Sequence, residues 1–121
     1  MKIQESEEMY LETIYVLKMK SANVHAVDVA SELNYSRPSV SRAMGLLKNK
    51  GYITFDASRG ISLTEEGKKR AQSVYVKHEV ITWLFVKMGA SESLAEENAC
   101  RIEHVISDEM FEVLKKFSEK C

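Results

Sequence analysis

The sequence of 121 residues predicts a mainly α-helical protein with one small β-wing. Apolar residues recur at helical spacing over most of the chain, and hydroxyl residues stand where several helices would begin. Residues 52–63 differ, because β-branched and aromatic residues alternate there around a polar turn. Hydrophobic residues make up 45% and charged residues 29%, a composition typical of folded domains rather than disordered chains.

The first helix is expected to start after an N-cap at Ser6 and to run to about Lys20. Glu7 and Glu8 would lie in its first turn, where the helix macrodipole favours acidic side chains. The positions that repeat at helical spacing are Met9, Tyr10, Thr13, Ile14 and Leu17.

Two more helices are expected before residue 51. A short one should cover about residues 27–33 and end near Asn34. Ser36 would cap the other, with Pro38 in its first turn, and this helix should reach about Lys50. A short and a longer helix separated by a tight turn have the proportions of a helix-turn-helix.

The remaining elements follow in order. Residues 52–55 and 61–63 are expected to pair as a two-stranded wing across the turn at 56–60. Three helices complete the chain: one capped by Thr64 and ending at Gly89, one from Ser91 or Ser93 through Ile106, and one capped by Ser107.

Charge is distributed unevenly along the chain, although the net charge is only −1. Residues 36–70 hold eight basic and three acidic side chains, whereas residues 1–35 and residues 71–121 each carry a net charge of −3. A phosphate backbone would be attracted to the basic region alone.

The start of the third helix has the side chains that DNA recognition requires. Hydroxyl groups near a helix N-terminus donate to phosphates, and arginine forks match guanine edges. A basic cluster is more often a solvated surface, but its place within a helix-turn-helix followed by a wing favours binding of double-stranded DNA. The candidate contacts are Ser36, Arg37, Pro38, Ser39, Ser41 and Arg42, with Arg59 at the wing tip for counterion release.

Cys100, Glu103 and His104 have the spacing i, i+3, i+4, which would place them on one helix face. A thiol, a carboxylate and an imidazole suit Fe(II), Co(II), Ni(II) or Zn(II), and suit calcium or magnesium poorly. One helical turn would leave such an ion half exposed. Met9 could supply a further soft ligand, and an ordinary core methionine is the alternative interpretation.

Several classes of protein are disfavoured by the sequence. Two cysteines are too few for a disulfide scaffold, and no apolar run approaches the ~20 residues of a membrane span. The N-terminus lacks the order of a signal peptide, so a cytoplasmic protein without membrane contact is expected. No nucleophile stands with a base and an orienting group, so we expect no enzyme activity.

Three stretches, residues 8–15, 36–42 and 99–109, closely resemble the diphtheria toxin repressor family of iron- and manganese-dependent transcriptional repressors. The resemblance implies a winged helix-turn-helix DNA-binding domain, which we place at residues 1–72, followed by an α-helical metal-binding and dimerisation domain at 73–121. It further implies a short form without an SH3-like domain, and a homodimer that binds a palindromic operator when metal-loaded.

The resemblance also implies a primary metal site. The residues that match the iron-type ligands are Met9, Cys100, Glu103 and His104. Manganese-type members have aspartate and glutamate at the positions of Met9 and Cys100, so the match favours Fe(II), with Mn(II) as the alternative. A second site would use His78 with Glu12 and Glu103, or would include Glu96.

Two departures from the iron-type pattern affect these expectations. Thr82 stands in place of a glutamate of the second site, and Arg42 replaces a glutamine of the recognition helix. Two other functions stay open at this point: a winged-helix regulator that needs no metal, and a redox sensor that uses Cys100 and Cys121.

Overall fold

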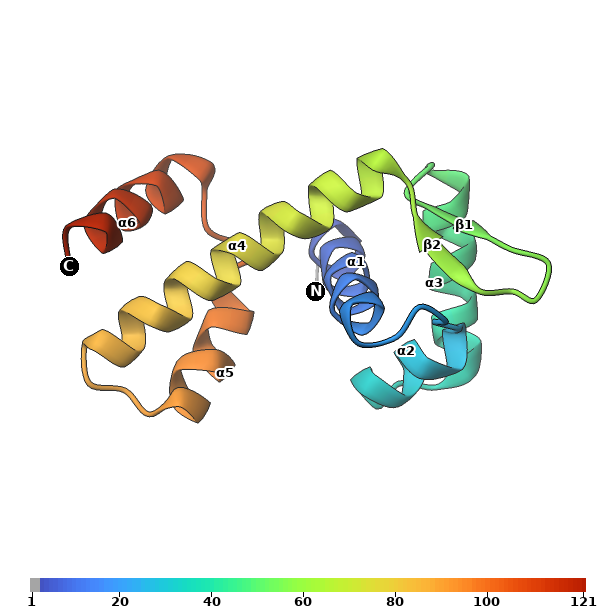
Figure 1. Ribbon diagram of the computed structural model, residues 1–121, viewed down its shortest axis with the longest axis horizontal. Helices are drawn as coiled ribbons and strands as arrows, with labels where there is room; N and C mark the ends of the chain where they lie inside the picture. Colours follow the sequence, from blue (N-terminus) through green and yellow to red (C-terminus); the bar gives the residue numbers. More distant parts are fainter. Residues whose placement is uncertain (1–2) are drawn as a thin grey trace. The chain divides into compact units, whose positions relative to one another are not determined.

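The computed structural model describes the backbone of residues 3–121 and the side chains of residues 5–121. This part of the chain forms two compact units, and the division between Gln72 and Ser73 falls inside one long helix (Figure 1). The elements are α1 (Ile3–Lys20), α2 (Ala26–Leu33), α3 (Arg37–Asn49), β1 (Ile53–Phe55), β2 (Ile61–Leu63), α4 (Glu65–Lys87), α5 (Glu92–Ile102) and α6 (Asp108–Lys120). The predicted fold class, mainly α with a small β-wing, is therefore confirmed.

The tight turn between α2 and α3 depends on two residues. Asn34 ends α2 in the left-handed region, at φ 57°, which asparagine tolerates better than most residues. Ser36 then begins α3, because its hydroxyl oxygen accepts the N–H of Ser39. Both ends of the turn agree with the prediction from sequence, as does Pro38 in the first turn of α3.

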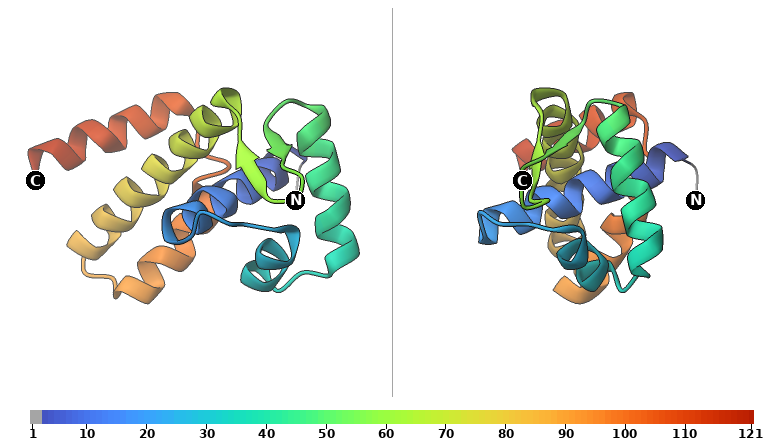
Figure 2. Two further views of the ribbon diagram at one scale, coloured as in Figure 1. Left: turned by 45° about the vertical axis from the view of Figure 1, so that its right-hand side comes forward. Right: turned by 90° about the vertical axis from the view of Figure 1, so that its right-hand side faces the viewer.

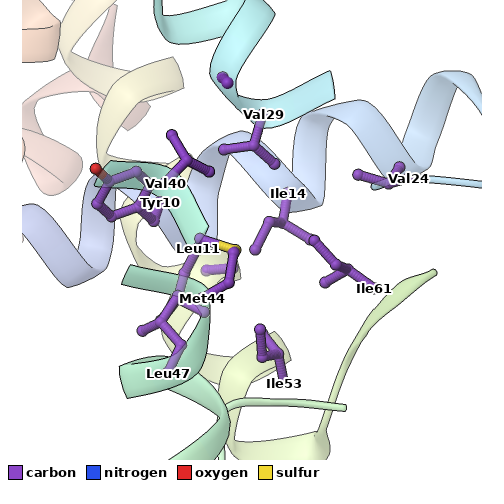
Figure 3. Close-up of a cluster of buried hydrophobic side chains, with 12 residues drawn as sticks. Tyr10, Leu11, Ile14, Val24, Val29, Val40, Met44, Leu47, Ile53 and Ile61 are labelled. Atoms are coloured by element: carbon purple, nitrogen blue, oxygen red, sulfur yellow. The ribbon is translucent and has the colours of Figure 1, made fainter. Parts of the chain in front are cut away.

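The core of the first unit lies where α1, α2, α3 and the hairpin meet. Figure 3 shows apolar side chains from these elements pointing toward one another. Val40, Met44 and Leu47 are all buried and form the inner face of α3. Burial of one such side chain contributes about 1.5–3 kcal/mol, so this face holds α3 firmly in the unit.

The hairpin is antiparallel and pairs Ile53 with Leu63. Its strands lie against α3 and α1, as both views in Figure 2 show. Within the turn, the Asp56 carboxylate accepts the N–H groups of Ser58 and Gly60 at 2.9 and 2.8 Å. These hydrogen bonds, from Gly60 first and then Ser58, lower the pKa of Asp56. The wing tip is thereby a defined loop rather than a loose one.

The beginning of α4 is fixed to the end of α3 and to β1. The Thr64 hydroxyl accepts the N–H of Gly67 and donates to the carbonyl of Gly51, which confirms the predicted cap. Gly67 has no space for a side chain, since a Cβ there would lie 2.0 Å from the carbonyl oxygen of Tyr52. The chain therefore requires glycine at this position.

The second unit contains the rest of α4 with α5 and α6. Gly89 has φ 112° just after α4, and Ser91 rather than Ser93 caps α5 by accepting the N–H of Leu94. Ser107 caps α6 as predicted. The buried side chains of this unit are Val74, Ile81, Leu84, Ala95, Ala99, Glu103 and Phe111. Among the described residues, no helix is both long and apolar enough to cross a bilayer.

Two predicted helix ends are wrong. The first helix begins at Ile3, so Ser6 lies inside α1 and is not its cap. The fifth helix ends at Ile102 instead of Ile106. Ser107 must be extended, at ψ 153°, to cap α6, and residues 103–105 form the turn that leads to it.

Candidate metal centre

Three side chains of the second unit gather into a cluster of metal-ligating type: His78 on α4, Cys100 on α5, and Glu103 at the C-cap of α5. One ligand atom of each lies within 4.8 Å of those of the others. His78 Nδ1 is 2.8 Å from Glu103 Oε2 and 3.8 Å from Cys100 Sγ. We call these three residues the HCE cluster.

His104 adjoins the HCE cluster through Glu103. Its Nε2 lies 3.2 Å from Glu103 Oε1, so the two carboxylate oxygens face two different imidazoles. The Glu103 side chain is only 1% exposed, whereas Cys100 is exposed. A buried carboxylate is costly without a positive partner, and the protonated His78 imidazole or a bound cation supplies one.

The neighbours of His78 change its affinity for protons. The Cys100 thiol and then the Glu103 carboxylate raise the pKa of His78 from 6.5 to about 10, against burial, which lowers it. Because this pKa lies above the value of 6.5, the protonated imidazole stabilises the metal-free fold fully below about pH 6.5, and this contribution is lost as the pH rises toward 10. At neutral pH a metal ion must therefore displace the His78 proton.

A pH dependence of metal binding follows from this competition. We expect the association constant for Co(II) to rise with pH until about pH 10, because the bound ion must displace the His78 proton. In a His78→Gln variant the slope of the logarithm of this constant against pH should fall by about one. Titrations at several pH values would measure it, and an unchanged slope would show that His78 is not deprotonated on binding.

The donor set of the cluster fits a first-row divalent ion. Thiolate sulfur, imidazole nitrogen and carboxylate oxygen together match Fe(II), Co(II) or Zn(II), whereas magnesium and calcium prefer oxygen alone. His78, Cys100 and Glu103 could hold such an ion, with His104 beside them. The arrangement is therefore suited to holding such an ion.

The structure brings together residues that were expected at two different metal sites. His78 was expected at a second site with Glu103, and its Nδ1 lies 2.8 Å from that carboxylate. It also lies 3.8 Å from Cys100, which was expected only at the primary site. Glu96 is exposed on α5 and belongs to none of the metal-type clusters among the described residues. Cys100, Glu103 and His104 were predicted to share one face of a helix. In the structure only Cys100 lies on α5, and Glu103 and His104 follow its last residue.

Met9 and Glu12 belong to α1 in the first unit, and both are half-buried. The Met9 sulfur accepts a hydrogen bond from the Tyr35 hydroxyl, with the two atoms 3.6 Å apart. Sequence reasoning did not single out Tyr35. No local pattern could have shown it, because the two residues are separated by 26 positions.

The predicted DNA-contacting residues form the exposed start of α3. Arg37, Pro38, Ser41 and Arg42 are exposed there, whereas Ser36 and Ser39 are joined by the cap hydrogen bonds. Arg59 is exposed at the wing tip, and its guanidinium stacks on the Phe55 ring, 4.5 Å from the centroid. Such stacking restrains a long side chain that would otherwise be mobile.

Comparison with known proteins agrees with both units. Residues 2–61 match the N-terminal DNA-binding domain of iron-dependent repressors, and residues 64–121 match their metal-binding and dimerisation domain. The chain belongs to the diphtheria toxin repressor family. This family is one of metal-dependent transcriptional repressors.

Individual relatives extend this match. A helix-turn-helix transcriptional regulator of Methanocaldococcus jannaschii, MJ0568, is 36% identical over 98% of this chain and 96% of its own. The transcriptional regulator MntR of Escherichia coli is 31% identical over 92% of this chain and 72% of its own. The diphtheria toxin repressor of Corynebacterium diphtheriae is 31% identical over 88% of this chain, which spans 47% of that repressor.

A solved structure is similar over both units. The manganese regulator SloR superimposes with a TM-score of 0.79 at 30% sequence identity, over 92% of this chain and 52% of the SloR chain. This chain therefore spans about half the length of SloR and of the diphtheria toxin repressor.

Proposed function

We propose that this family member represses transcription as a homodimer that binds palindromic operator DNA when it holds Fe(II). The observation that carries the proposal is the HCE cluster, in which Cys100 Sγ lies 3.8 Å from the His78 imidazole. A thiolate among the ligands favours Fe(II), Co(II) or Zn(II) over the harder Mn(II). Mn(II) stays the alternative, because SloR is a manganese regulator.

The primary ligands in this proposal are Met9, Cys100, Glu103 and His104, and the observed contacts add His78. Met9 comes from the first unit and the others from the second, so a bound cation would cross-link the two. A ligand shifts a conformational equilibrium only by its differential affinity for the two states. Without Met9, a metal ion would bind only to ligands of the second unit. Such an ion would not favour one conformation of the whole protein over another.

The turn of α1 that bears Met9 is tied to the rest of the first unit. The Glu7 carboxylate accepts hydrogen bonds from Lys50, at the end of α3, and from Arg70 on α4 at 2.7 Å. Burial acts to raise the pKa of Glu7, but the Lys50 and Arg70 hydrogen bonds outweigh it and the pKa is lowered. A constraint on Met9 is therefore transmitted to α3, the helix that would enter the major groove.

Dimerisation in this proposal uses the apolar side chains that the second unit exposes. Leu94, Met110, Val113 and Phe117 are each about half exposed or more. A two-fold dimer would set two recognition helices one turn of DNA apart, about 34 Å, or a multiple of that spacing.

Substitutions on the DNA-binding surface test which residues read bases. Arg42→Ala should weaken operator binding by about 1–3 kcal/mol. It should thereby reduce the difference in affinity between operator DNA and random DNA. Lys68→Ala should weaken binding to both DNAs by the same factor, and should lower the salt dependence by about one counterion. Gel shifts at several salt concentrations measure both effects, and equal loss in the two variants would show that Arg42 reads no base.

The metal requirement has its own test. Operator binding should be lost with a chelator and restored anaerobically by Fe(II), with Mn(II), Co(II) and Zn(II) titrated alongside. Equal binding with and without the chelator would instead identify a winged-helix regulator that needs no metal.

A further inference from the structure

The Met9 thioether already has a partner in the first unit. The Tyr35 hydroxyl donates to Met9 Sδ across 3.6 Å, which is within the range of hydrogen bonds to sulfur. The Tyr35 ring also meets the Tyr10 ring edge to face, with centroids 6.3 Å apart at 75°. Two contacts therefore hold the Tyr35 side chain over the first turns of α1.

The backbone of Tyr35 forms the turn of the helix-turn-helix. Its N–H bonds to the carbonyl of Ala30 at 3.0 Å, and the next residue is Ser36, the cap of α3. The Tyr35 side chain consequently joins the turn before the recognition helix to the sulfur that we propose as a metal ligand.

A hydroxyl group and a metal ion make opposing demands on this sulfur. Both draw electron density from one sulfur atom, so a hydrogen bond weakens that sulfur as a ligand, and coordination weakens it as an acceptor. The coupling is reciprocal: if Tyr35 lowers metal affinity, bound metal must loosen the Tyr35 contact by the same factor.

We propose that Tyr35 is a positioning residue that competes with the metal ion for the Met9 thioether, and thereby raises the metal concentration at which the repressor responds. This inference rests on the proposed function, since it takes Met9 as a ligand. A weak hydrogen bond to sulfur corresponds to a change in metal affinity of about two- to fivefold.

A double-mutant cycle on the full chain tests the competition. Co(II) affinity is measured anaerobically, without DNA, for the wild type, Tyr35→Phe, Met9→Leu and the double variant. Tyr35→Phe keeps the ring and its contact with Tyr10 but removes the hydroxyl. It should bind Co(II) about two- to fivefold more tightly than the wild type, and should have no effect in the Met9→Leu background. Tyr10→Phe is the matched control, which removes a neighbouring hydroxyl and should leave the affinity unchanged.

The outcomes separate this inference from the proposed ligand set. If Met9→Leu weakens Co(II) binding but Tyr35→Phe leaves it unchanged or weaker, Met9 is a ligand and the competition is refuted. If Met9→Leu has no effect, the proposed ligand set fails at Met9 and the competition fails with it. An equal gain from Tyr35→Phe with and without Met9 would also overturn the inference, because the hydroxyl would then act elsewhere.

An independent signal comes from the tyrosine itself. With carbon-13 at the Cζ of tyrosine, the Tyr35 resonance should shift when Zn(II) is added to the wild type, because its hydroxyl loses the sulfur acceptor. The shift should be absent in Met9→Leu. A Tyr35 resonance that Zn(II) leaves unmoved in the wild type, or shifts equally in the wild type and in Met9→Leu, would contradict the proposal.

Discussion

Replacement of Glu103 by glutamine should weaken Co(II) binding by about 100-fold or more, and should abolish metal-dependent retention of operator DNA. Glutamine keeps the shape of the side chain but removes its negative charge. That charge is almost fully buried, and its two oxygens face His78 at 2.8 Å and His104 at 3.2 Å. The neutral side chain would leave a bound cation without its only carboxylate from this cluster. Anaerobic metal titration followed by gel shift measures both losses.

Glu97→Gln is the matched control for this substitution. Glu97 lies on α5, the helix that Glu103 follows, is exposed, and pairs only weakly with Arg101 at the surface, at 3.3 Å. The metal affinity and operator binding of the Glu97→Gln variant should equal those of the wild type. Retention of DNA by Glu103→Gln at the wild-type metal concentration would remove Glu103 from the ligand set.

Exchange of the two sulfur ligands should change which metal the protein prefers. In a variant with Met9→Asp and Cys100→Glu, the ratio of Co(II) to Mn(II) affinity should fall by about tenfold or more, because oxygen ligands remove the advantage of the softer ion. Competition titrations against a fluorescent chelator measure this ratio. Cys121→Glu is the control, since Cys121 is the other exposed cysteine and should leave selectivity unchanged. An unaltered ratio in the double variant would mean that neither sulfur binds the metal.

Local sequence signals predicted most of the fold. Ser36, Thr64 and Ser107 cap the helices that follow them, and Asn34 ends α2, because each acts through hydrogen bonds or backbone angles within a few residues. The hairpin could also be predicted from local sequence signals. The end of α5 was not, since the residues from Glu103 to Ile106 have no helix breaker and their conformation depends on where α6 begins.

The candidate site was predictable only in part. Spacing along one helix indicated Cys100, Glu103 and His104, but the contact of His78 with Cys100 requires α4 and α5 to pack with particular faces together. Ala95 and Ala99 on α5 are fully buried, and a periodicity argument does not reveal which neighbours bury such small residues. The contact between Tyr35 and Met9 likewise joins segments that only the folded first unit brings together.

The ligand set is tested most directly by X-ray absorption at the iron edge of the Fe(II)-loaded protein, which counts the sulfur atoms bound to iron. We predict two sulfur ligands in the wild type, one in Met9→Leu and one in Cys100→Ser, because a single ion would join the thioether of the first unit to the thiolate of the second. The same sulfur count in the wild type and in Met9→Leu would contradict a cation shared between the two units.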